Sequence, residues 1–391
     1  MKIAMVFDGL QTGGIEKVGS TYSKIFCSNK HKVTIFNLVP SETLMKCQFD
    51  SRCEYIEFKY PRYLAPERFE QLEKNYALGK FLYPFIYVIL IIINYIYKIL
   101  FRIRFNKKYD LIIAFSGHFN DLSFVARNYI RGRKKVCWLH GALYQYALLS
   151  YGYLHLYNKI HNLVVLVSDS QREVISYNKR LKLNISKVYN PVSTHNSVNY
   201  NRVKEIKNKY GNFILMVARF TYPHKDHYTV IRAFNLLCNK FHDKRINLVL
   251  VGDGPNFNNI KKYIDSLDKK VKSRIFLVGN QKDVTSFYSA AFCLVHASVF
   301  GEGLPTVILE AMANNCPVVT TDSKVGPREI IGDNEYGLLC PVQDYKKMAN
   351  QINRLQSSSE LYDLYVKKGR IRIKDFYPES VYHRLKRTLF N

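Results

Sequence analysis

The sequence predicts an α/β protein made of two doubly wound domains, each built around a parallel sheet. Short apolar runs alternate with segments of helical periodicity along the chain, which is typical of strands that are buried on both faces. The chain has 391 residues, more than one hydrophobic core usually serves. A polar stretch at residues 188–203 interrupts the pattern and marks the expected boundary between the domains.

The apolar runs are the expected strands of the two sheets. They are residues 3–7, 32–38, 110–115, 135–141 and 162–168 in the first half, and 213–219, 246–252, 274–279, 293–298 and 317–321 in the second. Open parallel sheets bind ligands beyond the carboxyl ends of their strands. Two such sheets that face one another therefore predict a site in the cleft between them.

Positive charge dominates the composition. Lys and Arg number 58 against 31 Asp and Glu, which gives a formal net charge of +27. This charge favours an anionic partner, namely nucleic acid, an acidic membrane surface or a phosphorylated substrate, although a coding bias toward Lys, Asn, Ile and Tyr explains it equally well.

The cysteines and the N-terminal residues predict a cytoplasmic protein. The 8 cysteines form no Cys-x-x-Cys pair and no group with zinc-ligand spacing, so we expect reduced thiols. Residues 1–10 lack the length and the cleavage site of a signal peptide, and we therefore expect no export.

Residues 81–105 differ from the rest of the chain because they are apolar almost throughout. Only 17 residues separate Lys80 from Lys98, which is the lower limit for spanning a bilayer. Basic residues gather from Lys98 to Lys108, and an apolar helix with a basic flank is typical of a helix that lies in an anionic membrane surface. A helix buried between two strands of the first sheet remains an alternative.

The pair Gly13-Gly14 follows the first expected strand and opens a helix. This position favours phosphate binding by backbone amides, but the spacing fits no common nucleotide fingerprint, and a Gly-Gly pair in a turn is often only structural. The sequence contains no Asp-x-Asp pair and no histidine cluster with ligand spacing. We therefore expect no metal and no cofactor, with protein cations and helix dipoles holding any diphosphate.

Glu302 and Glu310 stand in the stretch "GEGLPTVILEAMA" with no other charged residue between them. Pro305 predicts a helix from about residue 305 to 314, which places Glu302 in the preceding loop and Glu310 on the second turn. Carboxylates accept hydrogen bonds from the paired hydroxyls of sugars. The alternative is that Glu302 only favours the helix dipole and Glu310 is solvated.

Arg219 ends one expected strand, and Lys225 follows six residues later, just before a helix. Two cations at the carboxyl end of a strand are placed to hold a diphosphate, Arg through its planar fork and Lys as a point charge. A turn at residues 252–255, which includes Gly254, reaches the same edge of the sheet. Each cation alone would more often be a solvated surface charge.

Taken together, these motifs resemble the retaining glycosyltransferases of family 4, which have the GT-B architecture of two facing Rossmann-like domains. The resemblance rests on Gly13-Gly14, Arg219, Lys225, the "VGDGP" turn, the E-x7-E pattern, and residues 317–331 and 336–344. It is specific over residues 213–344 and looser before them. His140 matches the histidine that faces the donor sugar in this family.

The resemblance implies a role for each matched residue. Arg219 and Lys225 would hold the donor diphosphate, Glu310 the nucleotide ribose, and Glu302 the hydroxyls of the transferred sugar. His140 would touch the sugar near the reacting carbon. The remaining donor-binding residues would be Gly13, Gly14, Gly254, Gly303, Leu304 and Pro305.

The resemblance also implies a function. Residues 1–195, completed by a C-terminal helix at 376–391, would form the acceptor-side domain, and residues 196–375 the donor domain. The protein would be a retaining, metal-independent hexosyltransferase that moves a sugar, from a UDP-sugar by preference, to a lipid-linked saccharide. By family analogy it would work in surface polysaccharide (capsule or O-antigen) biosynthesis. The basic apolar helix at 81–105, and not the resemblance, predicts peripheral binding to the inner face of the plasma membrane and hence a lipid-linked acceptor.

Two alternatives of other classes remain. One is a non-catalytic subunit that binds a nucleotide sugar. The other is a basic nucleic-acid-binding protein, but that class needs basic residues interleaved with exposed aromatic ones, and here the basic residues flank an isoleucine run. The sequence therefore predicts no nucleic-acid partner.

Overall fold

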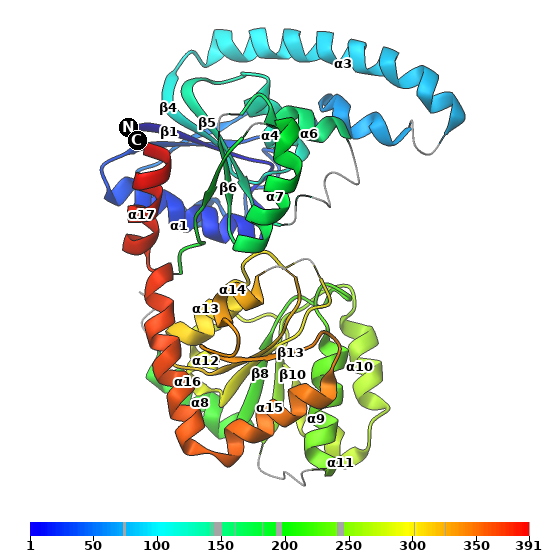
Figure 1. The fold of residues 1–391 in the computed structure, drawn as a ribbon, viewed down its shortest axis with the longest axis vertical. Helices are drawn as coiled ribbons and strands as arrows, with labels where there is room; N and C mark the ends of the chain where they lie inside the picture. Colours follow the sequence, from blue (N-terminus) through cyan, green and yellow to red (C-terminus); the bar gives the residue numbers. More distant parts are fainter. Residues whose placement is uncertain are drawn as a thin grey trace. The chain divides into compact units, whose positions relative to one another are not determined.

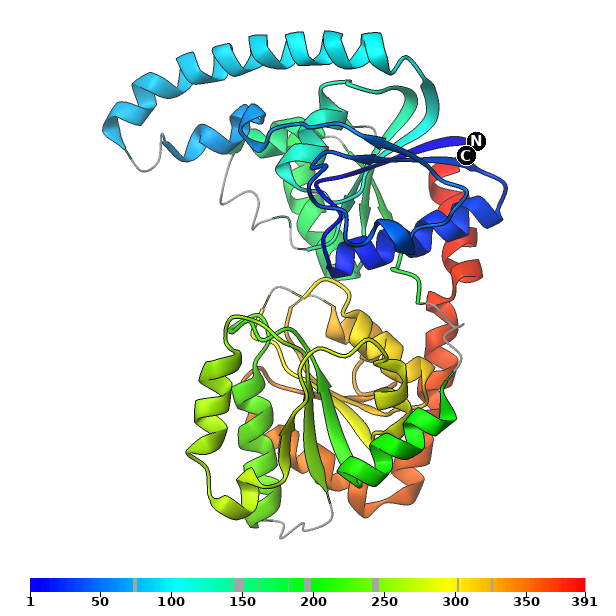
Figure 2. The same ribbon diagram turned by 180° about the vertical axis from the view of Figure 1, so that it is seen from behind.

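A computed structural model of the chain describes residues 1–72, 76–141, 143, 151–160, 162–181, 183–192, 198–240, 246–300, 302–324 and 326–390. These residues form two compact units (Figures 1 and 2). Unit 1 comprises Met1–Pro191 with Tyr382–Asn391, and unit 2 comprises Val192–Val381. The sequence predicted that the first domain would end at residue 195 and that the chain would return to it after residue 375, whereas the observed boundaries follow Pro191 and Val381.

Unit 1 is built on a seven-stranded parallel sheet in the order β3-β2-β1-β4-β5-β6-β7. Its strands are β1 (Lys2–Phe7), β2 (Lys32–Asn37), β3 (Glu54–Glu57), β4 (Lys108–Ala114), β5 (Arg131–Leu139), β6 (Asn162–Val165) and β7 (Asn184–Lys187). The central strands are buried on both faces, which explains why they read as continuous apolar runs.

Helices cover both faces of this sheet (Figures 1 and 2). They are α1 (Gly14–Ser28), α3 (Ala77–Arg104), α4 (Phe119–Ala126), α6 (Tyr151–Tyr157) and α7 (Ser168–Leu181), with short turns η1 (Lys46–Gln48), η2 (Arg62–Leu64) and η3 (Pro66–Glu70). The end of α17 (Pro378–Leu385) and η5 (Lys386–Phe390) also pack on unit 1. There Tyr382 Oη lies 2.9 Å from Nε2 of His31, and Nζ of Lys134 donates to the carbonyl of Leu389 at 2.8 Å.

Unit 2 is built on a six-stranded parallel sheet in the order β10-β9-β8-β11-β12-β13. Its strands are β8 (Phe213–Val217), β9 (Asn247–Val251), β10 (Ile275–Leu277), β11 (Cys293–His296), β12 (Val318–Thr321) and β13 (Leu338–Cys340). The helices are α8 (Tyr200–Tyr210), α9 (His227–Lys240), α10 (Phe257–Asp265), α11 (Lys269–Lys272), α12 (Thr285–Ala290), α13 (Thr306–Ala313), α14 (Pro327–Ile331), α15 (Tyr345–Ser357) and α16 (Ser359–Arg372), followed by η4 (Ile373–Phe376). The predicted α/β fold with two doubly wound parallel sheets is confirmed.

Every expected strand is present, and the strands that the sequence did not predict lie at sheet edges. β3 and β7 are the two edges of the first sheet, and β13 is one edge of the second. β3 and β7, with the sequences EYIE and NISK, are only partly buried and mostly polar, so they lack the apolar signal of an interior strand.

Helix α3 runs along the outside of unit 1 (Figure 1). It is held there by Asn94, which is 4% exposed. Oδ1 of Asn94 accepts from Tyr60 Oη at 2.7 Å and from Tyr129 Oη at 2.9 Å, and Nδ2 donates to the carbonyl of Leu90 at 2.9 Å. Leu90 and Phe101, on the same face of the helix, are buried in the core of the unit.

The opposite face of α3 is apolar and exposed. By length and composition, Leu78–Arg104 could cross a membrane, and only 17% of its most apolar window is buried. The exposed side chains recur at helical spacing and include Leu78, Phe81, Phe85, Val88, Ile92, Tyr95, Ile99 and Ile103. The alternative of a helix buried between strands is therefore wrong.

Candidate active site

The predicted donor residues of unit 2 gather where the chain order of its sheet reverses. The chain leaves β8 for β9 and β10 on one side and returns to β11 on the other, so the reversal lies between β8 and β11. Arg219 and Lys225 follow β8, and Glu302 follows β11. The carboxyl side of such a switch point is where open α/β sheets bind ligands.

Arg219 lies on the loop after β8 and is exposed, and among the described residues its guanidinium has no hydrogen-bond or ion-pair partner. The turn after β9 supports this loop. The amide of Phe220 donates to the carbonyl of Asp253 at 3.0 Å, and the amide of Asn256 donates to the carbonyl of Phe220 at 2.9 Å. Gly254 has φ +156, and a Cβ there would lie 2.7 Å from that Phe220 oxygen. Gly254 thus lets the turn press against the loop that carries Arg219.

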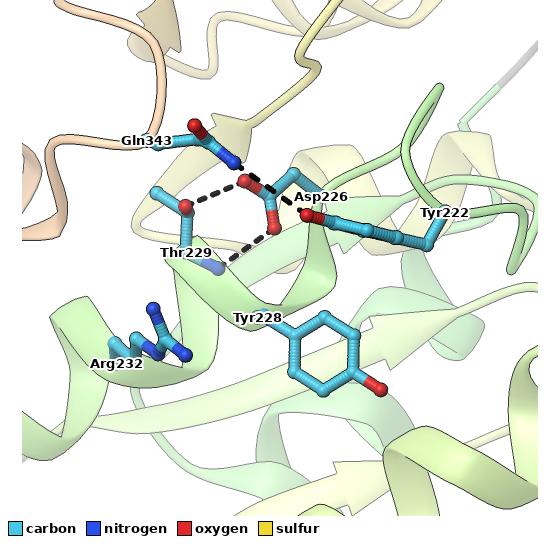
Figure 3. Close-up of a pocket in the computed structure, with 6 residues that line it drawn as sticks. All are labelled: Tyr222, Asp226, Tyr228, Thr229, Arg232 and Gln343. Atoms are coloured by element: carbon cyan, nitrogen blue, oxygen red, sulfur yellow. Dashed lines mark hydrogen bonds between the residues drawn. The ribbon is translucent and has the colours of Figure 1, made fainter.

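Asp226 directly follows Lys225 in the chain and fixes the backbone at this point. It caps α9 by accepting from the amide of Thr229 at 3.0 Å and from the Thr229 hydroxyl at 2.6 Å. Its own amide donates to the carbonyl of Ala297 at 2.9 Å. Asp226 lines the cavity of about 410 Å³ whose residues are drawn in Figure 3, but none of the predicted donor residues lines it.

Lys225 and Glu302 form a close ion pair between Nζ and Oε1. His296 adds a third group, with its Nε2 3.5 Å from the same carboxylate oxygen. Burial favours a raised pKa for Glu302, which is only 7% exposed, but Lys225 and His296 outweigh burial and hold that pKa well below its usual range. Glu302 is therefore a carboxylate at neutral pH.

His296 was not predicted as a site residue. It ends β11, is 1% exposed, and has Nδ1 3.3 Å from the hydroxyl of Thr320 on β12. Burial lowers the pKa of His296, so the imidazole is neutral at pH 7. The signal in the sequence was a polar residue at the end of the apolar run "CLVHAS", as for His140 in "KVCWLHG".

Helix α13 begins at Thr306, directly after Pro305, as the sequence predicted. Pro305 offers no side-chain cap, so the first amides of the helix are available to a ligand. The preceding residues Gly303 and Leu304 are pressed against the loop before α14, because a Cβ on Gly326 would lie 1.7 Å from the carbonyl oxygen of Gly303. Only glycine fits at position 326.

Glu310 lies on the second turn of α13, as predicted. Oε2 of Glu310 accepts a hydrogen bond from the hydroxyl of Tyr288 at 3.0 Å. Burial raises the pKa of Tyr288 well above its usual value, so the hydroxyl keeps its proton and remains a donor. Tyr288, which the sequence did not single out, thus orients the carboxylate of Glu310.

The remaining predicted residues belong to unit 1. Gly13 is the N-cap of α1 in an extended conformation, and Gly14 is the first helical residue, where a Cβ would meet no other atom within 4 Å. His140 follows β5, and its Nε2 donates to the carbonyl of Phe115 at 2.8 Å. Burial lowers the pKa of His140 to about 4, which leaves Nδ1 as an acceptor at neutral pH.

The structure therefore brings Lys225 and Glu302 into contact at the switch point of unit 2, with Arg219 on the loop that precedes Lys225 and Glu310 on the second turn of α13. It places Gly13, Gly14 and His140 at the carboxyl edge of the unit 1 sheet. In the part of the chain that the structure describes, no three His, Cys, Asp or Glu side chains are arranged to hold a metal ion.

A family model described as glycosyl transferases group 1 matches residues 198–372, which is most of unit 2. Over these residues the chain is similar to the group 1 glycosyl transferases. The matched residues include Arg219, Lys225, Glu302 and Glu310, together with His296 and Tyr288. Gly13, Gly14 and His140 lie outside the match.

Several relatives of the chain are named as glycosyltransferases, and one is named as an exopolysaccharide phosphotransferase. An N-acetylgalactosamine-N,N'-diacetylbacillosaminyl-diphospho-undecaprenol 4-alpha-N-acetylgalactosaminyltransferase of Campylobacter jejuni is 30% identical over 189 residues, which are 48% of this chain and 49% of the relative. The amylovoran biosynthesis glycosyltransferase AmsD of Erwinia amylovora is 26% identical over 225 residues, 56% of this chain and 59% of the relative. The chain spans about half the length of the curated relatives it matches.

A solved structure shares the fold over the whole length. HepE of Anabaena, crystallised in complex with UDP and glucose, aligns with a TM-score of 0.71 and 19% identity, covering 100% of this chain and 99% of HepE. At this identity the likeness establishes the fold, which is that of a two-domain GT-B protein.

Proposed function

We propose that the protein is a retaining, metal-independent hexosyltransferase that moves a sugar from a nucleotide-diphosphate sugar to a lipid-linked saccharide. One observation carries the proposal: the exposed Arg219, the Lys225–Glu302 pair and the uncapped start of α13 lie at the switch point of a group 1 glycosyltransferase domain. Cations and helix amides together form a site for a diphosphate.

Binding of the donor would separate the ion pair between Lys225 and Glu302. A diphosphate that binds Arg219 through the guanidinium fork also attracts Nζ of Lys225, and this competes with Glu302 for the lysine. Glu302, released from Lys225, then accepts hydrogen bonds from hydroxyls of the transferred sugar. A UDP-sugar is favoured because HepE, which has the same fold, binds UDP and glucose.

Breaking the sugar–phosphate bond builds negative charge on the leaving oxygen. Arg219, Lys225 and the α13 amides would stabilise this charge without reorganising, and they would supply the positive charge that a metal ion supplies elsewhere. Attack on the same face of the sugar, with the departing phosphate taking the acceptor proton, would retain the anomeric configuration. His140, with its unprotonated Nδ1, would contact a sugar hydroxyl.

Activity of the purified chain tests this proposal. We expect one or more UDP-sugars to raise the melting temperature, because a ligand at 100 times its Kd adds about 2.7 kcal/mol of stability. We also expect slow donor hydrolysis that EDTA leaves unchanged, and a product with the anomeric configuration of the donor by NMR. Reversible loss of turnover on chelation would rule out the metal-free mechanism, and donor binding without any turnover would identify a non-catalytic subunit.

Helix α3 supports a location at the cytoplasmic face of the membrane. Its exposed apolar row covers a helix 28 residues long, and the last turn carries Arg102 and Arg104. An apolar face with a basic flank binds the surface of an anionic bilayer. The lipid-linked acceptor named for the Campylobacter jejuni relative, and the polysaccharide pathway of AmsD, point to surface polysaccharide assembly as the setting.

Flotation with vesicles tests the membrane location. The triple variant Phe81→Ser/Phe85→Ser/Ile92→Ser should lose binding to vesicles that contain phosphatidylglycerol. The matched control Ile175→Ser/Leu364→Ser/Ile371→Ser removes three side chains that are 54%, 43% and 55% exposed elsewhere, and it should bind like the wild type. Equal binding by both variants would contradict the proposal.

A further inference from the structure

A cavity of about 430 Å³ lies at the amino edge of the sheet of unit 1. It is lined by the first residue of each of four neighbouring strands, namely Lys2 of β1, Lys32 of β2, Glu54 of β3 and Lys108 of β4. These strands are parallel, so their first residues lie together at one edge although they are far apart in the chain. The other lining residues are Thr34, Asn106, Lys107 and Tyr109. We call this site the lysine cavity, and its volume is in the range of small-molecule sites.

Positive charge dominates the lysine cavity. Lys107 and Glu54 form a close ion pair, and Glu54 also accepts from the hydroxyl of Thr34 at 3.2 Å. The side chains of Lys2, Lys32 and Lys108 make no ion pair and no hydrogen bond with the residues that the structure describes. Like charges that share a cavity repel one another, and a bound anion offsets this repulsion. The three lysines therefore favour an anionic ligand.

Tyr109 adds a buried hydroxyl to the lining. The residue is 6% exposed, and its Oη has no hydrogen-bond partner within the described part of the chain. Burial raises the pKa of Tyr109 by more than the neighbouring Thr34 lowers it, so the hydroxyl keeps its proton at neutral pH. A buried donor without a partner is unfavourable. An oxygen atom of a ligand in the lysine cavity would supply the missing acceptor.

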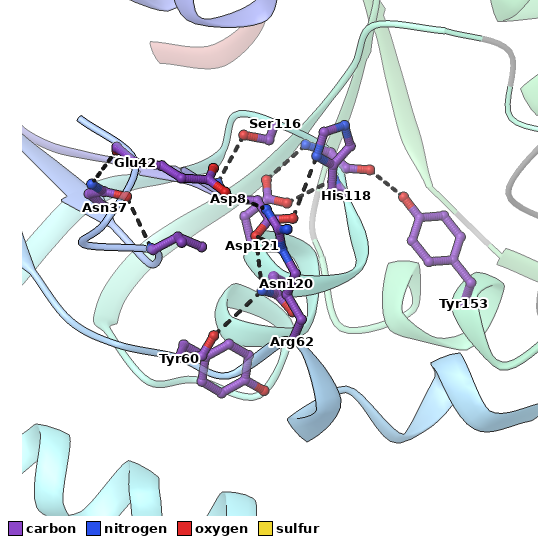
Figure 4. Close-up of polar contacts among 12 residues, drawn as sticks. Asp8, Asn37, Glu42, Tyr60, Arg62, Ser116, His118, Asn120, Asp121 and Tyr153 are labelled. Carbon is purple, nitrogen blue, oxygen red and sulfur yellow. Dashed lines mark hydrogen bonds and ion pairs between the residues drawn. The ribbon is translucent and has the colours of Figure 1, made fainter. Parts of the chain in front are cut away.

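The opposite edge of the same sheet carries the reverse balance of charge. The charged side chains that gather there are Asp8, Glu42, Arg62, His118 and Asp121 (Figure 4). Carboxylates outnumber cations in this group, whereas the lysine cavity contains four lysines and one carboxylate. Asp110, whose Oδ2 accepts from the amide of Lys2 at 2.7 Å, is not among the described residues that line the cavity. An anion is therefore attracted to the amino edge and repelled from the carboxyl edge.

The lysine cavity adjoins the end of α3. The helix ends at Arg104, and the residues Asn106 and Lys107, which follow it, line the cavity. This end of α3 and the N-terminus lie at the same end of unit 1 (Figures 1 and 2). The exposed apolar row of the helix reaches Ile103, which is 77% exposed. Under the proposed membrane location, the lysine cavity would lie beside the phosphate groups of the lipids.

We propose that the lysine cavity binds a phosphate ester through Lys2, Lys32 and Lys108. A phosphate group offers negative charge and several acceptor oxygens, which matches three cationic donors. An anionic phospholipid and a soluble phosphate metabolite both present this group. The site itself does not depend on the proposed function, because the predicted site residues of unit 1 lie at the carboxyl edge of the sheet. Only the supply of the phosphate by lipid, which the position at the end of α3 favours, rests on the proposed membrane location.

Titration of the full chain with glycerol 3-phosphate tests the site. Binding is followed by the rise in melting temperature, at constant ionic strength so that general screening does not change. We expect the lysine variant, Lys2→Gln/Lys32→Gln/Lys108→Gln, to bind at least about 100-fold more weakly than the wild type, because three charge-assisted hydrogen bonds are lost.

The matched control is Lys261→Gln/Lys262→Gln/Lys270→Gln, which removes three exposed lysines of α10 and α11 and makes the same change of net charge. It should bind glycerol 3-phosphate like the wild type. Tyr109→Phe should weaken binding by about 10-fold without lowering the melting temperature of the free protein, since the lost hydroxyl has no partner there among the described residues. The inference would be overturned by a wild-type chain without saturable binding, by equal affinities of the lysine variant and its control, or by an unchanged affinity of Tyr109→Phe.

Flotation with vesicles that contain phosphatidylglycerol identifies the source of the phosphate. If lipid supplies it, the lysine variant should bind these vesicles at least about 10-fold more weakly than its control. Equal flotation of the two variants, with glycerol 3-phosphate binding lost only in the lysine variant, would assign the site to a soluble phosphate ester. A wild-type chain that binds glycerol 3-phosphate but no vesicles would contradict the proposed membrane location and would support the phosphate site.

Discussion

Lys225 and Glu302 neutralise one another at the switch point of unit 2. A buried charge without a partner is costly, so each side chain of the pair stabilises the charged form of the other. We propose that a bound diphosphate replaces Glu302 as the partner of Lys225. Arg219 differs because it is exposed and makes no ion pair among the described residues. The two cations should therefore affect donor binding differently, with Arg219 acting at first contact and Lys225 acting only after it exchanges partners.

Loss of either cation should lower activity strongly. Arg219→Gln and Lys225→Met are each expected to raise the barrier of transfer by about 2 to 4 kcal/mol, because each removes one preorganised positive group. Steady-state kinetics with a UDP-sugar checks this. The control Lys262→Met removes an exposed lysine of α10 and should leave kcat/KM unchanged. A loss below about twofold for both site variants would contradict the assigned site.

His140 should remain neutral and should make the protein less stable in acid. Its folded pKa of about 4 lies below the ordinary value of 6.5, so its stabilising effect is complete above pH 6.5 and is lost as the pH falls toward 4. The unfolding free energy of the wild type relative to His140→Gln should therefore fall by about 1 to 2 kcal/mol between pH 7.5 and pH 5. NMR should find the proton on Nε2 at pH 7, and a proton on Nδ1 would contradict the structure.

At the scale of elements, α3 combines a fixed face with an exposed one. Asn94 explains why a polar residue occurs inside an apolar helix, since its amide joins Tyr60, Tyr129 and Leu64. The sequence predicted the helix and its basic flank, but it could not indicate which side is buried. That depends on tyrosines from segments that lie more than 30 positions away in the chain.

Replacing Asn94 should destabilise unit 1, whereas replacing a residue on the exposed face should not. Asn94→Ala leaves buried hydroxyl and carbonyl groups without a partner, at a cost of about 2 to 4 kcal/mol. Ile96→Ala, on the same helix, removes a side chain that is 51% exposed and should cost less than about 0.5 kcal/mol. Urea unfolding measures both, and similar values for the two variants would show that α3 is not anchored as described.

The position of the loop that carries Glu302 depends on the close packing of Gly326 against Gly303. Gly326→Ala would place Cβ against the carbonyl of Gly303, so this loop must move, at a cost of about 1 to 3 kcal/mol and with a loss of transfer. Gly369→Ala is the control, because Cβ there meets Met312 Cγ at 3.5 Å, an ordinary contact, within helix α16. It should be neutral or slightly stabilising. Thermal unfolding and transfer assays of both variants give the comparison.

At the scale of the whole molecule, the two sheets were predictable because interior strands of parallel sheets are apolar on both faces. Arg219, Lys225 and Glu302 could be found because each stands close to such a strand. His296 and Tyr288 could not be assigned, since their partners Glu302 and Glu310 are met only after folding. The sequence did not predict that Asp8 and His118 are neighbours for the same reason. They are 110 positions apart in the sequence, but in the folded chain Nδ1 of His118 lies 3.6 Å from Oδ2 of Asp8.

The C-terminal residues should stabilise the unit at the other end of the chain. Truncation after Val381 removes the contacts of Tyr382 with His31, of Leu389 with Lys134, and of Arg384, which lies 4.6 Å from the ring centre of Tyr189. Hydrogen exchange by mass spectrometry should therefore speed up in α1, β2 and β5. Peptides of β8 to β13 should keep their protection, and faster exchange there instead would contradict the division into units.

The anchoring of α3 also limits how unit 1 can sit on lipid. Because Asn94, Leu90 and Phe101 lock the helix to the core, the helix cannot tilt or sink by itself. Under the proposed membrane location, a bilayer that binds the apolar row would hold unit 1 in a single orientation, in which it would rotate about the membrane normal and diffuse laterally. Encounters with lipid-borne molecules would then become a search in two dimensions instead of three.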